Sequence, residues 1–229
     1  MMRDALAELD KVVSRRVFFD RIFKAVSLVA AMDVIGPKAF GALTAADKAT
    51  ALAVYSACCK LVIPVDQDPG WATFEPGISD YGLNVFVGQV ALGGSQQALD
   101  GFIGALVAFN QAPRTLGYND LFLNMAPDAQ LQYFTTSLTG GFEADGYGDV
   151  LVVAAFFCMF TAKATFFSNY PRHLAQDTEF QVLQPSNVKT GWDIMGWKGP
   201  VGPEEEKALR AKYYDAPVIP GIDFSNPWI

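Results

Sequence analysis

The strongest constraint on the fold is a series of apolar patterns with helical spacing, with almost none of the alternation that is typical of strands. The clearest example is LTAADKATALAVYSACCKLVIP, residues 43–64. Thr44 and Asp47 have the spacing of a capping box, and Pro64 is expected to end the helix. One face of this helix is apolar and carries Ala51, Val54, Tyr55, Cys58, Leu61 and Val62.

Three further helices are expected in the middle of the chain. The second is predicted over residues 80–92 with Ser79 as its N-cap, and the third follows Ser95. The fourth has Pro127 in its first turn and stops at the glycine pair 140–141. All of these boundaries follow from capping and helix-breaking residues that flank apolar runs.

The fifth helix, expected over about 149–168, is the most apolar. Lys163 interrupts its apolar run, which favours a central core helix over a membrane span. Together the five patterns predict an all-α fold, in which a compact domain of about five or six helices occupies residues 42–170.

The character of the chain changes after Pro171. Residues 171–229 hold seven of the 13 prolines and three of the four tryptophans, and only PEEEKALRAKYY, residues 203–214, is helical in pattern. A long irregular Pro/Gly/Trp-rich segment must pack on its own core or on another protein. Trp and Tyr are frequent interface anchors, so the candidate partner-interface residues here are Trp192, Trp197, Tyr213, Tyr214 and Trp228.

Residues 1–41 have the features of an export signal. Ser14, Arg15, Arg16 and Phe18 resemble the twin-arginine pattern S-R-R-x-F-L-K, although Phe19 and Asp20 depart from its end. The apolar segment over residues 25–35 is too short for a membrane span, which needs about 20 residues, but suits a signal peptide. Residues 39–41, Ala-Phe-Gly, have the small-residue pattern of the A-x-A type, which predicts cleavage before Ala42. The alternative is an amphipathic N-terminal helix with a basic edge.

The charge distribution is uneven. Residues 1–41 carry seven basic and five acidic residues, whereas the rest of the chain carries ten basic and nineteen acidic ones. A basic head on an acidic body fits a targeting segment, and a net charge of −7 disfavours nucleic acid as a partner. The apolar content of 51% excludes disorder as the dominant state.

The three cysteines, Cys58, Cys59 and Cys158, cannot all pair within one chain. No CxxC is present, so neither a zinc ribbon nor a c-type haem site is encoded. The simpler interpretation is a set of buried free thiols. The alternative is that one of them, with Cys158 as the candidate interface residue, bridges to a partner subunit in an oxidising compartment.

The chain has no pattern of an autonomous enzyme. It lacks GxGxxG and Walker motifs, and its one histidine, His173, is interpreted as a surface or interface residue. Asp66, Asp68 and Glu75 could approach a calcium ion but lack EF-hand spacing. Asp145 and Asp149 are explained by capping or solvation. No catalytic, cofactor-binding or metal residues are therefore assigned. The twin-arginine route exports folded proteins with cofactors, which indicates that the cofactor-bearing cargo is another chain.

Several segments resemble the gluconate 2-dehydrogenase subunit 3 family. They are the twin-arginine start and, within roughly residues 43–200, LTAADKATALAVYSACCKLVIPVDQDPG, ISDYGLNVFV, APDAQLQYF, FFCMFTAKATFF and GWDIMGWKGP. The chain departs from the family at residues 185–187, Pro-Ser-Asn, where the family tends to have a glycine pair before an asparagine.

The resemblance implies an all-helical accessory subunit without a redox centre. Such subunits accompany a large FAD-bearing dehydrogenase of the glucose-methanol-choline type through the twin-arginine translocase to the periplasm, and help it to fold or remain stable. A cytochrome c often accepts the electrons, and the complex can associate with the membrane. Related complexes oxidise glucose, fructose, gluconate or glucosides, with the glucoside 3-dehydrogenase type preferred here.

Two alternatives remain open at this point. One is an autonomous helical periplasmic protein, and the other is a cytoplasmic export chaperone without a dehydrogenase partner. If the accessory-subunit interpretation holds, the Pro-rich tail and the helix face with Val54 and Cys58 are expected to contribute to the interface with the large subunit.

Overall fold

The computed structural model describes residues 43–64, 70–142, 148–168, 170–171 and 190–194. All regular structure in these ranges is helical, without strands, which confirms the predicted all-α fold. The elements in chain order are α3 (Ala45–Val62), η1 (Trp71–Phe74), α4 (Gly77–Tyr81), η2 (Gly82–Ala91), α5 (Gln96–Gln111), η3 (Ala112–Arg114), η4 (Phe122–Asn124), α6 (Pro127–Leu138), α7 (Gly148–Phe166) and α8 (Gly191–Ile194).

Three helix starts follow the sequence signals. At α3 the hydroxyl of Thr44 accepts a hydrogen bond from the Asp47 amide, and the Asp47 carboxylate accepts one from the Thr44 amide, which completes the predicted capping box. At α5 the hydroxyl of Ser95 accepts from the Ala98 amide at 3.2 Å. Pro127 occupies the first turn of α6. These helices begin where local chemistry satisfies their free amides.

The second helix differs from its prediction. It begins at Gly77, not at residue 80, and winds as a π-helix, η2, from Gly82 onwards. Ser79 is not its N-cap: the side chain is buried and hydrogen-bonded to Trp71 and Glu75. The sequence signal was misleading because tertiary contacts use the Ser79 hydroxyl that a cap would need.

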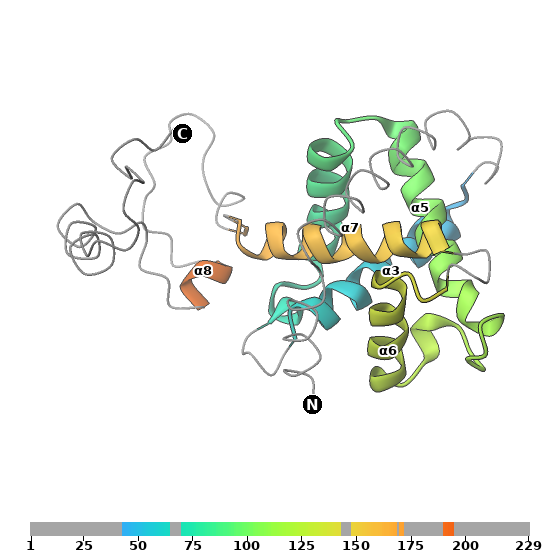
Figure 1. Ribbon diagram of the computed structural model, residues 1–229. Coiled ribbons are helices and arrows are strands. Elements are labelled where there is room, and N and C mark those ends of the chain that lie inside the picture. The colour runs from blue at the N-terminus through green and yellow to red at the C-terminus, as the bar shows by residue number, and fades with distance from the viewer. Residues whose placement is uncertain (1–42, 65–69, 143–147, 169, 172–189, 195–229) are drawn as a thin grey trace, which may run out of the picture.

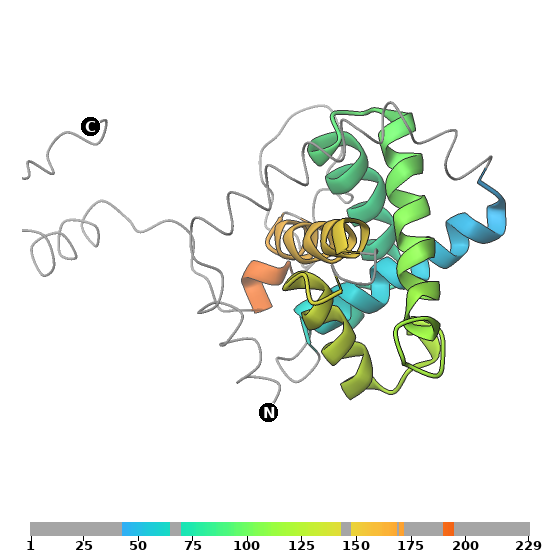
Figure 2. The same ribbon diagram turned by 45° about the vertical axis from the view of Figure 1, so that its right-hand side comes forward.

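Helix α7 is the centre of the described body. It packs against α3, α5, α6 and η2, and Figure 2 shows these elements arranged around α7, which is foreshortened in this view. In Figure 1 it runs across the middle of the molecule. Leu151, Ala154 and Cys158 on α7 are fully buried. The expectation of a central core helix is therefore confirmed.

A cluster of buried aromatic rings fills the part of the core between α5, η4 and α6. The ring of Phe109 lies 4.7 Å from that of Tyr133 and 5.0 Å from that of Phe122, both in edge-to-face geometry. The Tyr133 hydroxyl donates to the carbonyl of Phe109 at 3.1 Å. Buried aromatic pairs of this geometry contribute about 0.5–1.5 kcal/mol each beyond the area they bury.

Helix α8 attaches the first described part of the C-terminal segment to the core. Thr190 and Asp193 repeat the capping arrangement of α3, with the Thr190 amide donating to Asp193 at 2.7 Å. Gly191 lies against the carbonyl and ring of Phe166, where a larger residue would clash, and Thr190 is buried. Residues 190–194 thus pack on this chain's own core (Figure 1).

Candidate functional site

The exposed side of α7 is apolar in its middle turns, between the exposed Asp149 and Lys163. Val152, Phe156 and Met159 are half-buried, and Phe160 is 53% exposed. Their spacing places them along one side of the helix. The solvent side of a surface helix in a soluble protein is normally polar. This strip, defined here as the α7 aromatic strip, is therefore the main candidate for contact with another molecule.

Two stacked phenylalanine rings form the centre of the α7 aromatic strip. Phe156 and Phe160 stack with their centroids 6.4 Å apart and an interplanar angle of 8°. Phe156 also meets the core residue Phe157 edge-to-face at 6.4 Å. The exposed ring of Phe160 is thus held by a neighbour that is itself packed on the core, which reduces the entropy lost when a partner covers it. The four-residue spacing of these phenylalanines was the available sequence signal.

A second exposed apolar side chain lies on η2. Val90 is 66% exposed, and η2 packs directly against α7. Val90 is a single aliphatic residue, and exposed apolar residues of this kind are common on soluble proteins. We therefore use Val90 as the control position for substitutions at Phe160 and do not treat it as a candidate interface residue.

The stretch Asp149–Phe166 of α7 has a mean hydropathy of 1.7 and the length of a membrane span. About 61% of it is buried inside the described body. The four surrounding elements cover it as they would the core helix of a soluble domain.

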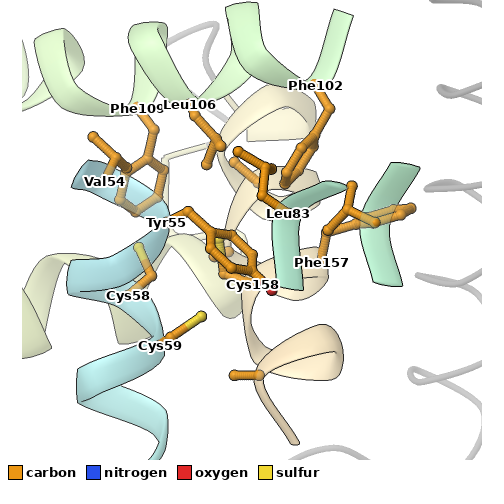
Figure 3. Close-up of a cluster of buried hydrophobic side chains, with 14 of the residues drawn as sticks. Val54, Tyr55, Cys58, Cys59, Leu83, Phe102, Leu106, Phe109, Phe157 and Cys158 are labelled. Atoms are coloured by element: carbon orange, nitrogen blue, oxygen red, sulfur yellow. The ribbon is translucent and has the colours of Figure 1, made fainter. Parts of the chain in front are cut away.

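The three cysteines meet in the core. Cys58 and Cys59 of α3 and Cys158 of α7 lie in the same part of the core (Figure 3), and all three are free and fully buried. This confirms the interpretation as buried free thiols. Burial, followed by the contact with Cys158, raises the pKa of Cys58, and burial likewise raises the pKa of Cys59. Both thiols stay protonated near neutral pH and are poor nucleophiles there.

A polar cluster around Glu75 connects η1, α4 and α3. One carboxylate oxygen, Oε1, accepts hydrogen bonds from Ser56 at 2.6 Å and from Trp71 Nε1 at 3.1 Å, and a third from Ser79. A single oxygen that accepts three donors acts as a structural anchor. Sequence reasoning considered Glu75 for a calcium site, assigned it no role for lack of EF-hand spacing, and missed this one, although Trp71 and Glu75 are four residues apart.

Asp66 and Asp68, the other two carboxylates considered for calcium and not assigned to it, lie outside the described residues. Within the described ranges no three His, Cys, Asp or Glu side chains are grouped to hold a metal ion.

A shallow groove of about 680 Å³ lies between the start of α3 and the end of α5. Asp47 and Arg114 are among its lining residues. Asn110 also lines it, but its amide oxygen already accepts the Leu123 amide at 3.1 Å. The lining mixes polar and apolar side chains, and Arg114 is the one basic residue among those that line the groove.

Most residues predicted from the sequence to act in export or assembly lie outside the described ranges. These are Ser14, Arg15, Arg16, Phe18, Trp197, Tyr213, Tyr214 and Trp228, together with His173 and Asp145. Trp192 is in α8, but its side chain is not among those described. Asp149 lies exposed in the first turn of α7. Roles for these residues remain predictions.

The described core bears on two expectations about the interface. Val54 and Cys58 were expected to face a partner, and this is wrong: both are fully buried within the chain's own core. Cys158, the other interface candidate on a helix, is also fully buried. The helical spacing identified the buried face of α3 correctly, but α5 and α7 cover that face.

Comparison with protein-family models gives no match, and comparisons with curated proteins and with solved structures give no significant match. What the structure defines is the class, an all-helical protein built around α7.

Proposed function

We propose that this chain is a non-catalytic small subunit that assembles with an FAD-dependent sugar dehydrogenase of the glucose-methanol-choline type, stabilises it and is exported with it. The proposal rests first on the segments that resemble the gluconate 2-dehydrogenase subunit 3 family. The single structural observation that supports it is the α7 aromatic strip, with Phe160 exposed and stacked on Phe156. Exposed aromatic residues on a rigid base are typical of protein interfaces.

In this proposal the chemistry belongs to the partner. The large subunit binds FAD and oxidises the sugar, with the glucoside 3-dehydrogenase type as the preferred class and a cytochrome c as the electron acceptor. This chain supplies the twin-arginine signal through Ser14, Arg15 and Arg16. The complex is then translocated folded into the periplasm.

The decisive experiment is a tagged purification of the full chain from its native host, followed by an absorption spectrum of the eluate. A large co-purifying chain with flavin absorption is the expected result, because the cofactor travels with the partner. A colourless chain that purifies alone from the periplasm would favour the autonomous protein. Recovery from the cytoplasm with varied export precursors would favour the chaperone.

Export is tested separately. An Arg15→Lys/Arg16→Lys variant is expected to retain both this chain and the flavin subunit in the cytoplasm. The matched control is Arg21→Lys, because Arg21 lies nearby but outside the twin-arginine pair. This variant is expected to be exported. Normal export of the double variant would contradict the signal assignment.

A further inference from the structure

We propose that, when no other protein covers it, the α7 aromatic strip binds the same strip of a second copy of this chain. The two α7 helices lie antiparallel in this pair and are related by a two-fold axis beside Phe156. The inference goes beyond the proposed function and does not depend on it, because it concerns the isolated chain. If the flavin subunit also binds this strip, the pair must dissociate before the two subunits assemble.

The residues on the exposed side of α7 are spaced symmetrically. At intervals of three, four, four and three residues they are Asp149, Val152, Phe156, Phe160 and Lys163. Because each residue of an α-helix turns the chain by about 100°, all five side chains lie within a sector of about 80°. Asp149, Phe160 and Lys163 are exposed, and the other two are half-buried. They form a single line of side chains that has the same spacing in either direction.

An antiparallel pair makes use of this symmetry. A two-fold axis beside Phe156 brings Lys163 of the second copy opposite Asp149 and Val152 of the second copy opposite Phe160. Each contact occurs twice, as in every two-fold interface. Each exposed ring then meets an aliphatic side chain, and each end of the line joins an acidic to a basic residue. A parallel pair in the same register would instead bring Asp149 opposite Asp149 and Lys163 opposite Lys163, which is unfavourable because like charges repel.

Apolar contact stabilises the pair, and the charges set its direction. Phe160 is 53% exposed, and its stack on Phe156, with centroids 6.4 Å apart, already fixes the ring. Covering a fixed ring loses little side-chain entropy. The charged ends lie in solvent, where a single ion pair contributes little to affinity. A strip about 21 Å long also buries much less than the roughly 1,600 Å² of a standard interface, so we expect a weak dimer with a Kd on the order of tens of micromolar.

The test measures the mass of the full chain, produced in a host that lacks the flavin subunit, by sedimentation equilibrium. The concentrations span the expected Kd, and we expect a monomer–dimer equilibrium. A chain that stays monomeric at about ten times that Kd would overturn the proposal. An open series of larger oligomers would also overturn it, because a two-fold pair closes at two copies.

Two substitutions locate the contact. Phe160→Ser is expected to raise the Kd of the dimer by about thirtyfold or more, because each pair loses two exposed rings. Val90→Ser is the matched control and should leave the Kd unchanged, since Val90 is an exposed apolar residue on η2, outside the strip. A dimer that Phe160→Ser leaves intact, or that both substitutions weaken equally, would contradict pairing through the α7 aromatic strip.

Charge reversal tests the antiparallel direction. Asp149→Lys and Lys163→Asp each bring like charges together at both ends of the pair and should raise the Kd by about tenfold at low salt. The double variant Asp149→Lys/Lys163→Asp restores opposite charges and should dimerise like wild type. An equimolar mixture of the two single variants should form mixed dimers, because opposite charges then meet at both ends. Single variants that dimerise as well as wild type, or a double variant as weak as the single ones, would overturn the assigned pairing.

Discussion

The hydroxyl of Tyr55 on α3 donates a hydrogen bond to Oγ1 of Thr161 on α7, across 2.8 Å in the buried core. The direction follows from the second contact of Thr161, whose hydroxyl donates to the Phe157 carbonyl at 2.6 Å. Thr161 has one hydroxyl hydrogen, so it accepts from Tyr55. Burial, with Cys59 close by, raises the pKa of Tyr55. The phenol remains neutral and serves to join two central helices.

Removing the Tyr55 hydroxyl is expected to be less costly than removing its acceptor. Tyr55→Phe leaves Thr161 with its bond to Phe157 and should lower the free energy of unfolding by about 0.5–1.5 kcal/mol. Thr161→Val removes the strong acceptor of a buried hydroxyl, which costs about 1–3 kcal/mol. Urea unfolding of both variants measures the difference. A larger loss for Tyr55→Phe than for Thr161→Val would contradict the donor direction.

Gly82 is expected to be intolerant of alanine because of the same hydroxyl. An alanine Cβ at residue 82 would lie 2.7 Å from the Tyr55 hydroxyl oxygen and 3.1 Å from its ring atom Cε1. Gly82→Ala should therefore cost about 1–3 kcal/mol, and less in a Tyr55→Phe background. Gly88→Ala is the control in the same helix, because its nearest neighbour is the flexible end of Leu99 at 3.3 Å. Equal losses at both glycines, measured by urea unfolding, would rule out this explanation.

Local sequence signals predicted the helices better than the contacts between them. The Thr44–Asp47 box depends only on residues within one turn, and it forms as predicted. Ser79 has the same capping chemistry, but Trp71 and Glu75 compete for its hydroxyl after the chain folds. No local pattern could reveal that competition, because it depends on how η1 packs beside α4.

At the candidate site, too, local sequence patterns identified apolar helix faces but not what covers them. The spacing of Val54 and Cys58 identified an apolar face, but only the packing of α5 and α7 shows that this chain covers it. Phe160 belongs to an equally apolar run and remains 53% exposed. Apolar periodicity predicts that a face will be buried, but the arrangement of the neighbouring helices decides whether the chain itself or a partner buries it.

Stability should fall as the solution becomes alkaline. Burial raises the pKa of Cys58 and Cys59 in the folded state, whereas unfolded thiols titrate near pH 8.5. Above about pH 8.5 the unfolded chain releases protons that the folded chain retains, so each thiol lowers stability by up to about 1.4 kcal/mol per pH unit. Urea unfolding with reductant at pH 7 to 9.5 measures this slope. A Cys58→Ala/Cys59→Ala variant should show a smaller decrease in the free energy of unfolding with pH. An unchanged pH dependence would mean that other titratable groups cause it.

Truncation separates the part of the C-terminal segment that packs on this core from the part expected to bind a partner. A chain ending at Ile194 keeps α8 on Phe166 and should unfold near the Tm of the full chain. A chain ending at Pro171 lacks α8 and should lose roughly 1 kcal/mol or more. Both lack Trp197 and Trp228, so the proposed flavin subunit is expected not to co-purify with either of them. Full retention by the chain ending at Ile194 would show that residues 195–229 do not hold the partner.

Phe160→Ser tests the α7 aromatic strip directly. Because Phe160 is 53% exposed, the substitution should change the stability of the isolated chain by no more than about 0.5 kcal/mol. If a partner covers this ring, the same substitution should weaken association by about 2 kcal/mol, or roughly thirtyfold in Kd. Val90→Ser is the matched control: its 66% exposed side chain lies on η2, and its loss should leave association unchanged. Urea unfolding of each isolated variant measures the stability, and titration against the proposed flavin subunit measures the association. Equal affinities for wild type and Phe160→Ser would place the interface elsewhere on the chain, whereas a selective loss at Phe160 would identify α7 as both the centre of the core and the surface that the partner binds.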